Sequence, residues 1–128
     1  MSNEKIERLL SEIVSCTGFT NIDQHDIDRF RKSADTIDAE MVVGRIDDVR
    51  ALLEKAFKSL TERNGARPLK QLLFSVRMPQ DGALLMEHMN DISDFLDRLE
   101  ENVFCLWGLS TVERLYEGQL EIIAVAGF

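Results

Sequence analysis

Hydrophobic and polar residues alternate along this chain with two spacings, one typical of helices and one typical of strands. Near the amino-terminal end, apolar residues recur every three or four positions and form one stripe, which predicts a helix over residues 3–16. The same spacing predicts three further helices, over residues 25–35, 46–62 and 82–99. Gly65 and Pro68 interrupt the pattern after the third of these helices, as helix-breaking residues should.

Four shorter segments are rich in β-branched and aromatic residues, and they predict strands over residues 37–43, 70–76, 102–109 and 119–126. The third strand segment is apolar at successive positions, which favours a place in the middle of a sheet. We therefore expect an α/β (α+β) fold: a single domain with a four-stranded sheet. The helices 46–62 and 82–99 should cover one face, and the helix 3–16 should enter the domain from outside.

A chain of 128 residues with 45% hydrophobic residues is long enough to bury a sizeable core as one domain. In the second helix, Ile27 and Phe30 should face inward. The other expected core residues are Leu53, Phe57, Leu73, Ile92, Leu96, Cys105, Trp107 and Ile122.

The formal net charge of −8 argues against general binding to nucleic acid, which requires a basic surface, and against adhesion to anionic lipid. The basic residues Arg29, Arg31 and Lys32 stand among acids and indicate a solvated helix face. The first residues do not have the pattern of a signal peptide, and no apolar run approaches the roughly 20 residues that span a bilayer. We expect a soluble, cytoplasmic protein without nucleic-acid or membrane partners.

A polar segment between the first two helices carries the most informative chemistry. It contains Asn21, Asp23 and Asp26 within a few positions of one another. Two carboxylates near a cation can orient a water molecule or accept its proton, while an amide holds the geometry. The alternative is purely structural, with Asp23 capping the helix that begins near His25 and Asp26 in its first turn.

This segment resembles the synergy loop of FtsZ, the tubulin-like division GTPase, in which an Asn and two Asp reach into the nucleotide site of the neighbouring subunit. Three other segments are similar to the same family: Gly65-Ala66-Arg67, Asn102–Gly108 and Gln119–Phe128. On this resemblance, residues 1–17 are a remnant of the central helix, residues 18–27 the synergy-type loop and residues 28–128 the C-terminal sheet domain. The sequence departs from the family pattern at Gln24, His25 and Asp28.

The resemblance implies a domain that lacks the GTP-binding domain of its family, because the chain contains no glycine-rich phosphate loop. Such a domain would bind no nucleotide or other cofactor, would not be an enzyme, and would cap or modulate filament ends of FtsZ or another tubulin-like GTPase. Asp26 would orient water, Asp23 would assist through water or a cation, and Asn21 would fix the loop. The alternatives are a C-terminal structural fragment of a polymer-forming GTPase that contributes catalytic Asp residues in trans, and a degenerate relic that acts as a weakly self-associating scaffold.

Other reactive residues have simpler interpretations. His25 and His88 lack a Cys or His partner at metal-ligand spacing, so no metal site is expected. The two cysteines, Cys16 and Cys105, lie in apolar surroundings and are interpreted as buried thiols.

Overall fold

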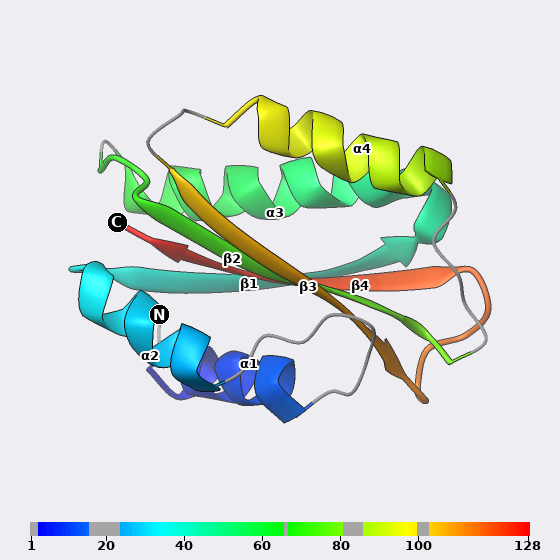
Figure 1. Cartoon of the computed structure of the whole chain (residues 1–128), viewed down its shortest axis with the longest axis horizontal. Coiled ribbons are helices and arrows are strands. Elements are labelled where there is room, and N and C mark those ends of the chain that lie inside the picture. The colour runs from blue at the N-terminus through cyan, green and yellow to red at the C-terminus, as the bar shows by residue number, and fades with distance from the viewer. Residues whose placement is uncertain (1–2, 16–23, 66, 81–85, 100–102) are drawn as a thin grey trace.

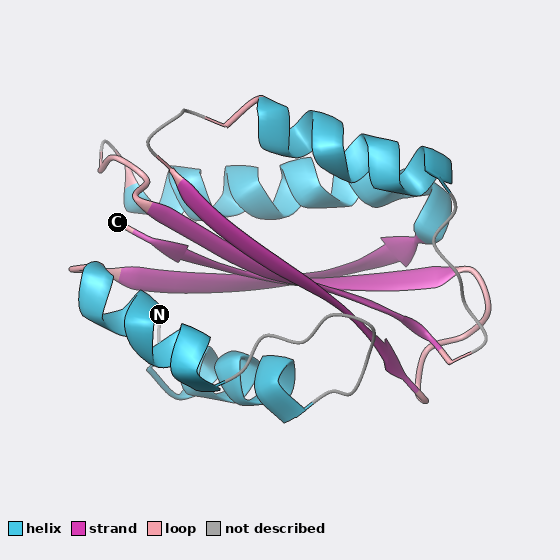
Figure 2. Ribbon diagram, in the orientation of Figure 1, coloured by secondary structure: helices cyan, strands magenta, loops and turns pink. Residues whose placement is uncertain are grey.

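The computed structural model describes residues 3–15, 24–65, 67–80, 86–99 and 103–128. A four-stranded sheet lies between two layers of helices, which confirms the predicted α/β class (Figures 1 and 2). The strands are β1 (Ile37–Arg45), β2 (Gln71–Pro79), β3 (Phe104–Val112) and β4 (Gln119–Gly127). The helices are α1 (Asn3–Ser15), α2 (Gln24–Ser33), α3 (Val49–Asn64) and α4 (Met86–Asp97), with a short 3-10 helix, η1 (Ile46–Asp48), before α3. In the described ranges, no helix has the length and apolar character that crossing a membrane requires.

The order of the strands in the sheet is β1-β4-β2-β3. The central strand β4 runs antiparallel to both of its neighbours, and β2 and β3 are parallel, with α4 in the connection between them. The prediction that segment 102–109 lies in the middle of the sheet is therefore wrong, because β3 is an edge strand. Its apolar residues have another cause: Trp107 packs toward the core beneath α3 and α4, and Leu106 packs toward the core on the other face.

The larger core lies between the sheet and the helices α3 and α4 (Figure 1). Three of the predicted core residues are buried in it: Leu53, Ile92 and Ile122. Four others are only half-buried and pack against its margin: Phe57, Leu96, Cys105 and Trp107. The margin is nonetheless ordered by aromatic contacts, since the Phe57 ring meets the Phe95 ring edge to face with centroids 5.9 Å apart.

A smaller core lies on the opposite face, beneath α1 and α2. The α1 residues Ile6, Leu9 and Leu10 are buried there against β1 and β4, so the prediction that this helix enters from outside is wrong. The physical reason is that successive side chains of a strand point to opposite faces of the sheet. Ile123 and Val125 of β4 point away from the larger core and need a second apolar layer to cover them. The predicted core residues Ile27, Phe30 and Leu73 are also buried here.

The end of α3 is tied to the edge strand β1. The helix ends at Asn64, two residues beyond the predicted end, and Gly65, predicted to interrupt the helix, follows with a φ of 62°, which residues with a side chain rarely adopt. Arg63 donates to the Asp38 carboxylate from Nε at 2.9 Å, and Asn64 donates to the same carboxylate at 3.0 Å. The buried Asp38 of β1 is thus satisfied by the last turn of α3.

Candidate functional site

The predicted site residues belong to the amino-terminal end of α2 and to the segment before it. Asn21 and Asp23 lie outside the described residues. Asp26 lies in the first turn of α2, and its side chain is half-buried. An acid in the first turn, with Arg31 and Lys32 in the last, complements the helix dipole. The structural interpretation of Asp26 therefore agrees with its position, and the same position puts the carboxylate beside a groove.

The position of α2 is fixed from two sides. Ile27 and Phe30, which are 1% and 3% exposed, insert into the smaller core. On the outer side, Arg31 donates a hydrogen bond to the Glu7 carboxylate of α1. This hydrogen bond lowers the pKa of Glu7 below its ordinary value and raises that of Arg31. The two helices are therefore held together by an ion pair in addition to their buried faces.

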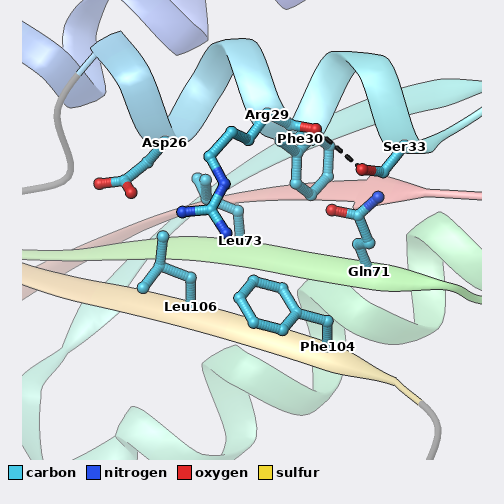
Figure 3. A pocket seen from close by; sticks show the side chains of 8 residues that line it. All are labelled: Asp26, Arg29, Phe30, Ser33, Gln71, Leu73, Phe104 and Leu106. Atoms are coloured by element: carbon cyan, nitrogen blue, oxygen red, sulfur yellow. Dashed lines mark hydrogen bonds between the residues drawn. The ribbon is translucent and has the colours of Figure 1, made fainter.

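A groove of about 430 Å³ runs between α2 and the strands β2 and β3. Its lining consists of Asp26, Arg29, Phe30 and Ser33 from α2, Gln71 and Leu73 from β2, and Phe104 and Leu106 from β3. Figure 3 shows Asp26 at one end of the groove and Gln71 and Phe104 at the other, with Arg29 reaching from the helix toward the strands. The Ser33 hydroxyl donates to the Arg29 carbonyl oxygen at 2.9 Å and so remains on its own helix.

The α2 side of the groove follows from helix geometry. Residues three or four positions apart lie in a row on one side of a helix, and this places Asp26, Arg29, Phe30 and Ser33 together. The strand side is apolar apart from Gln71, and Phe104 is 58% exposed. A carboxylate and a guanidinium at the mouth of an apolar trough suit contact with a complementary segment of another molecule. A carboxylate in the first turn of α2, such as that of Asp26, can also orient a water or a hydrated cation brought by a partner.

Sequence reasoning found Asp26 but missed most of the groove. The sequence places Arg29 with Arg31 and Lys32 on a solvated helix face, and only the arrangement in space separates Arg29, at the groove, from Arg31, at Glu7. Phe104 and Gln71 come from strands that are distant in sequence from α2, so no local pattern points to them. A group of possible metal ligands, Asp47, Glu87 and His88, lies away from this groove and was also missed.

No protein-family model and no curated protein matches this sequence. The structure, in contrast, is similar to solved structures of FtsZ and TubZ. An FtsZ dimer from M. jannaschii superposes over 95% of this chain with a TM-score of 0.70 and 19% identity. A point mutant of M. jannaschii FtsZ superposes over 97% of this chain with a TM-score of 0.71 and 19% identity. A TubZ-Bt four-stranded filament superposes over 98% of this chain with a TM-score of 0.68 and 8% identity.

The match covers 35% of the FtsZ chain in the dimer, 37% of the mutant FtsZ chain and 33% of the TubZ chain, so this chain spans about a third of the length of these proteins. At such low identity the comparison shows the fold. The described residues have the fold of the FtsZ C-terminal domain, and the resemblance inferred from the sequence is confirmed at that level.

Proposed function

We propose that this 128-residue chain binds the end of a filament built by FtsZ or another tubulin-like GTPase and modulates growth there. The observation that carries the proposal is the FtsZ-type fold combined with the placement of Asp26 at the start of α2, directly after the segment that contains Asn21 and Asp23. Two of the similar structures are an FtsZ dimer and a TubZ filament, so the fold occurs in proteins that associate with copies of themselves.

In this proposal the contact is head to tail. The amino-terminal end of α2 and the segment before it face the nucleotide of the last filament subunit, where Asp26 orients water, Asp23 acts through water or a cation, and Asn21 holds the segment. A heterologous contact of this kind uses different surfaces on the two partners. A chain that offers one of these surfaces can join a filament end and leave the next subunit without a surface on which to add.

Electrostatics sets a condition on the docking. The chain has a net charge of −8 and would bring carboxylates toward a triphosphate, so the like-charge repulsion must be offset. A metal ion bound with the partner's nucleotide supplies part of the compensation. Arg29, at the mouth of the groove, is a positively charged side chain on the same side of α2 as Asp26 and supplies another part.

The experiment adds the purified chain to a cognate FtsZ with GTP and records light scattering and phosphate release together. Because filament ends are few, the chain should lower polymer mass at concentrations well below one chain per FtsZ subunit. Asp26→Asn keeps the shape of the side chain and removes its charge, so it should preserve this effect while lowering hydrolysis at the capped end.

A second variant separates affinity from chemistry. The Asp28 side chain is exposed and accepts a hydrogen bond from Gln24 Nε2 at 3.0 Å, and it lies outside the resembling motif. Charge reversal by Asp28→Lys should therefore shift the concentration needed for capping and leave the hydrolysis per bound chain unchanged. Glu117→Gln, at an exposed position far along the chain, is the matched control and should behave as the wild type. Unchanged polymer mass even at equal stoichiometry would refute the proposal.

The second candidate is the role of a C-terminal structural part of a polymer-forming GTPase, or of a weakly self-associating scaffold. The observation that favours it is the coverage: a third of each similar chain is matched, and those chains assemble with their own kind. Sedimentation of the chain alone distinguishes the candidates, because self-association that rises with concentration supports the scaffold and a stable monomer supports the capping role.

A further inference from the structure

Three side chains of types that can bind a metal ion meet on the side of the sheet opposite to the groove. Asp47 belongs to η1, before α3, and Glu87 and His88 belong to the first turns of α4. Glu87 and His88 are adjacent in the chain, whereas Asp47 is far from them in sequence. The fold therefore brings Asp47 to this pair, which the sequence alone does not show.

The distances among the three ligand atoms suit one metal ion. His88 Nε2 lies 3.1 Å from Asp47 Oδ1 and 3.9 Å from Glu87 Oε1. Each residue offers one ligand atom, and all three atoms lie within 4.8 Å of one another. Ligands that surround a zinc ion tetrahedrally at about 2.1 Å are about 3.4 Å apart. The two distances from His88 Nε2 fall on either side of that separation.

The burial and the charge of these three side chains also favour binding of a metal ion. The His88 side chain is 5% exposed, so packing holds the imidazole, while the Asp47 and Glu87 side chains are both 72% exposed. A metal ion can therefore enter from solvent and keep water in its remaining positions. With a neutral imidazole the cluster carries two negative charges, in a chain whose net charge is already −8.

We propose that Asp47, Glu87 and His88 bind a single divalent transition-metal ion of the Zn²⁺ type. An imidazole with two carboxylates suits zinc, nickel or cobalt, whereas magnesium and calcium prefer ligand sets made of oxygen alone. The bound ion joins η1 to the start of α4 and so fixes the helical layer over the larger core. A simple hydrogen bond between His88 and Asp47 would hold the same two elements, but it would require no metal.

The test is titration calorimetry of the chelator-treated chain with zinc chloride, with magnesium chloride as the comparison. Zinc should bind saturably at one ion per chain, and magnesium should give no such isotherm. In His88→Gln the side-chain amide still reaches Asp47 as a hydrogen-bond donor but is a poor zinc ligand. The variant should therefore fold and should bind zinc at least about tenfold more weakly.

The other variants assign the remaining ligands. Glu87→Gln should also weaken zinc binding at least about tenfold, because it removes a charged ligand. Asp48→Asn removes the neighbouring acid, and His25→Gln removes the other histidine; both should bind zinc as the wild type does. In nitrogen-correlated spectra of the imidazoles, zinc should shift His88 and leave His25 in place. Absence of saturable binding, or equal affinity in His88→Gln and the wild type, would overturn the proposal.

Discussion

At the scale of single residues, the most consequential side chain is Glu121, a fully buried acid in the central strand β4. Arg77 of β2 stands opposite to it in the register and donates to Oε1 at 2.6 Å. Arg114 donates to both carboxylate oxygens, at 2.6 and 2.7 Å. The attraction between opposite charges offsets the cost of removing them from water only while every member of the network is present.

Replacing Glu121 by Gln should therefore be strongly destabilising. The buried Arg77 guanidinium would lose its compensating charge, whereas Arg114, whose side chain is 51% exposed, can turn to solvent. The loss on breaking such a buried pair is about 3–5 kcal/mol in the free energy of unfolding. Urea denaturation followed by circular dichroism measures it. Glu117→Gln, an exposed position nearby, should change the stability by less than about 0.5 kcal/mol. Equal stabilities of the two variants would mean that the network contributes little.

The thiol of Cys105 should be unreactive at neutral pH. It is a half-buried free cysteine, and burial raises its pKa to about 12. Because only the thiolate attacks iodoacetamide, alkylation of a Cys16→Ser variant should be much slower than that of glutathione between pH 7 and 9 and should accelerate only as the pH approaches about 12. In denaturing urea the same thiol should react at the ordinary rate, and fast alkylation of the folded variant would contradict the burial.

At the scale of elements, α1 joins α2 in covering the second face of the sheet. It was expected to approach the domain from outside, yet its inner residues are buried, and Glu7 pairs with Arg31 of α2. The helix is therefore part of the smaller core. Its contribution to stability can be measured directly.

Leu9→Ala should lower the free energy of unfolding by about 2–5 kcal/mol, since Leu9 is 1% exposed and truncation leaves a cavity. Arg8→Ala, on the exposed side of the same helix, should have an effect within about 0.5 kcal/mol. The two variants are compared by urea denaturation at neutral pH. A loss in the free energy of unfolding below about 0.5 kcal/mol for Leu9→Ala would contradict the packing of α1 in the smaller core.

The elements themselves were largely predictable because periodicity is a local property. The spacing of apolar residues over α3 and the stop at Gly65 needed no knowledge of the rest of the chain. The place of β3 was not predictable in this way. Its apolar residues suggest a central strand because Leu106 packs against the smaller core and Trp107 against the larger core. This packing depends on the tertiary structure and does not show which strands lie beside β3.

At the scale of the whole molecule, the chain should not bind GTP by itself. The sequence contains no glycine-rich phosphate loop, and its net charge of −8 disfavours a triphosphate. Calorimetry with GTP and magnesium should give no binding heat, with a complete FtsZ as the positive control. A saturable isotherm would refute the expectation and would support an enzymatic role.

The candidate site was predictable only in part, and the limit is again tertiary. Asp26 was found because its neighbours in sequence carry the chemistry. The groove beside it combines one helix with two strands, and the register that places Gln71 beside Phe104 is set by strand pairing. In the same way, Asp47 and His88 become neighbours only when α4 packs beside α3. Contacts between residues so far apart in the chain cannot be predicted from the local pattern of a single sequence.

The central place of β4 has a consequence for how the chain is made. Within these residues β4 is synthesised last, yet it separates β1 from the β2–β3 pair, so Ile37 must wait for Gly127 before it gains its partner. On the ribosome, β2 and β3 can therefore pair with each other, but β1 cannot join them before β4 is made, so apolar faces and strand edges stay exposed. Contacts this distant in sequence also slow folding. The sheet should close only after release of the last strand, and that interval is when the chain most needs protection from aggregation.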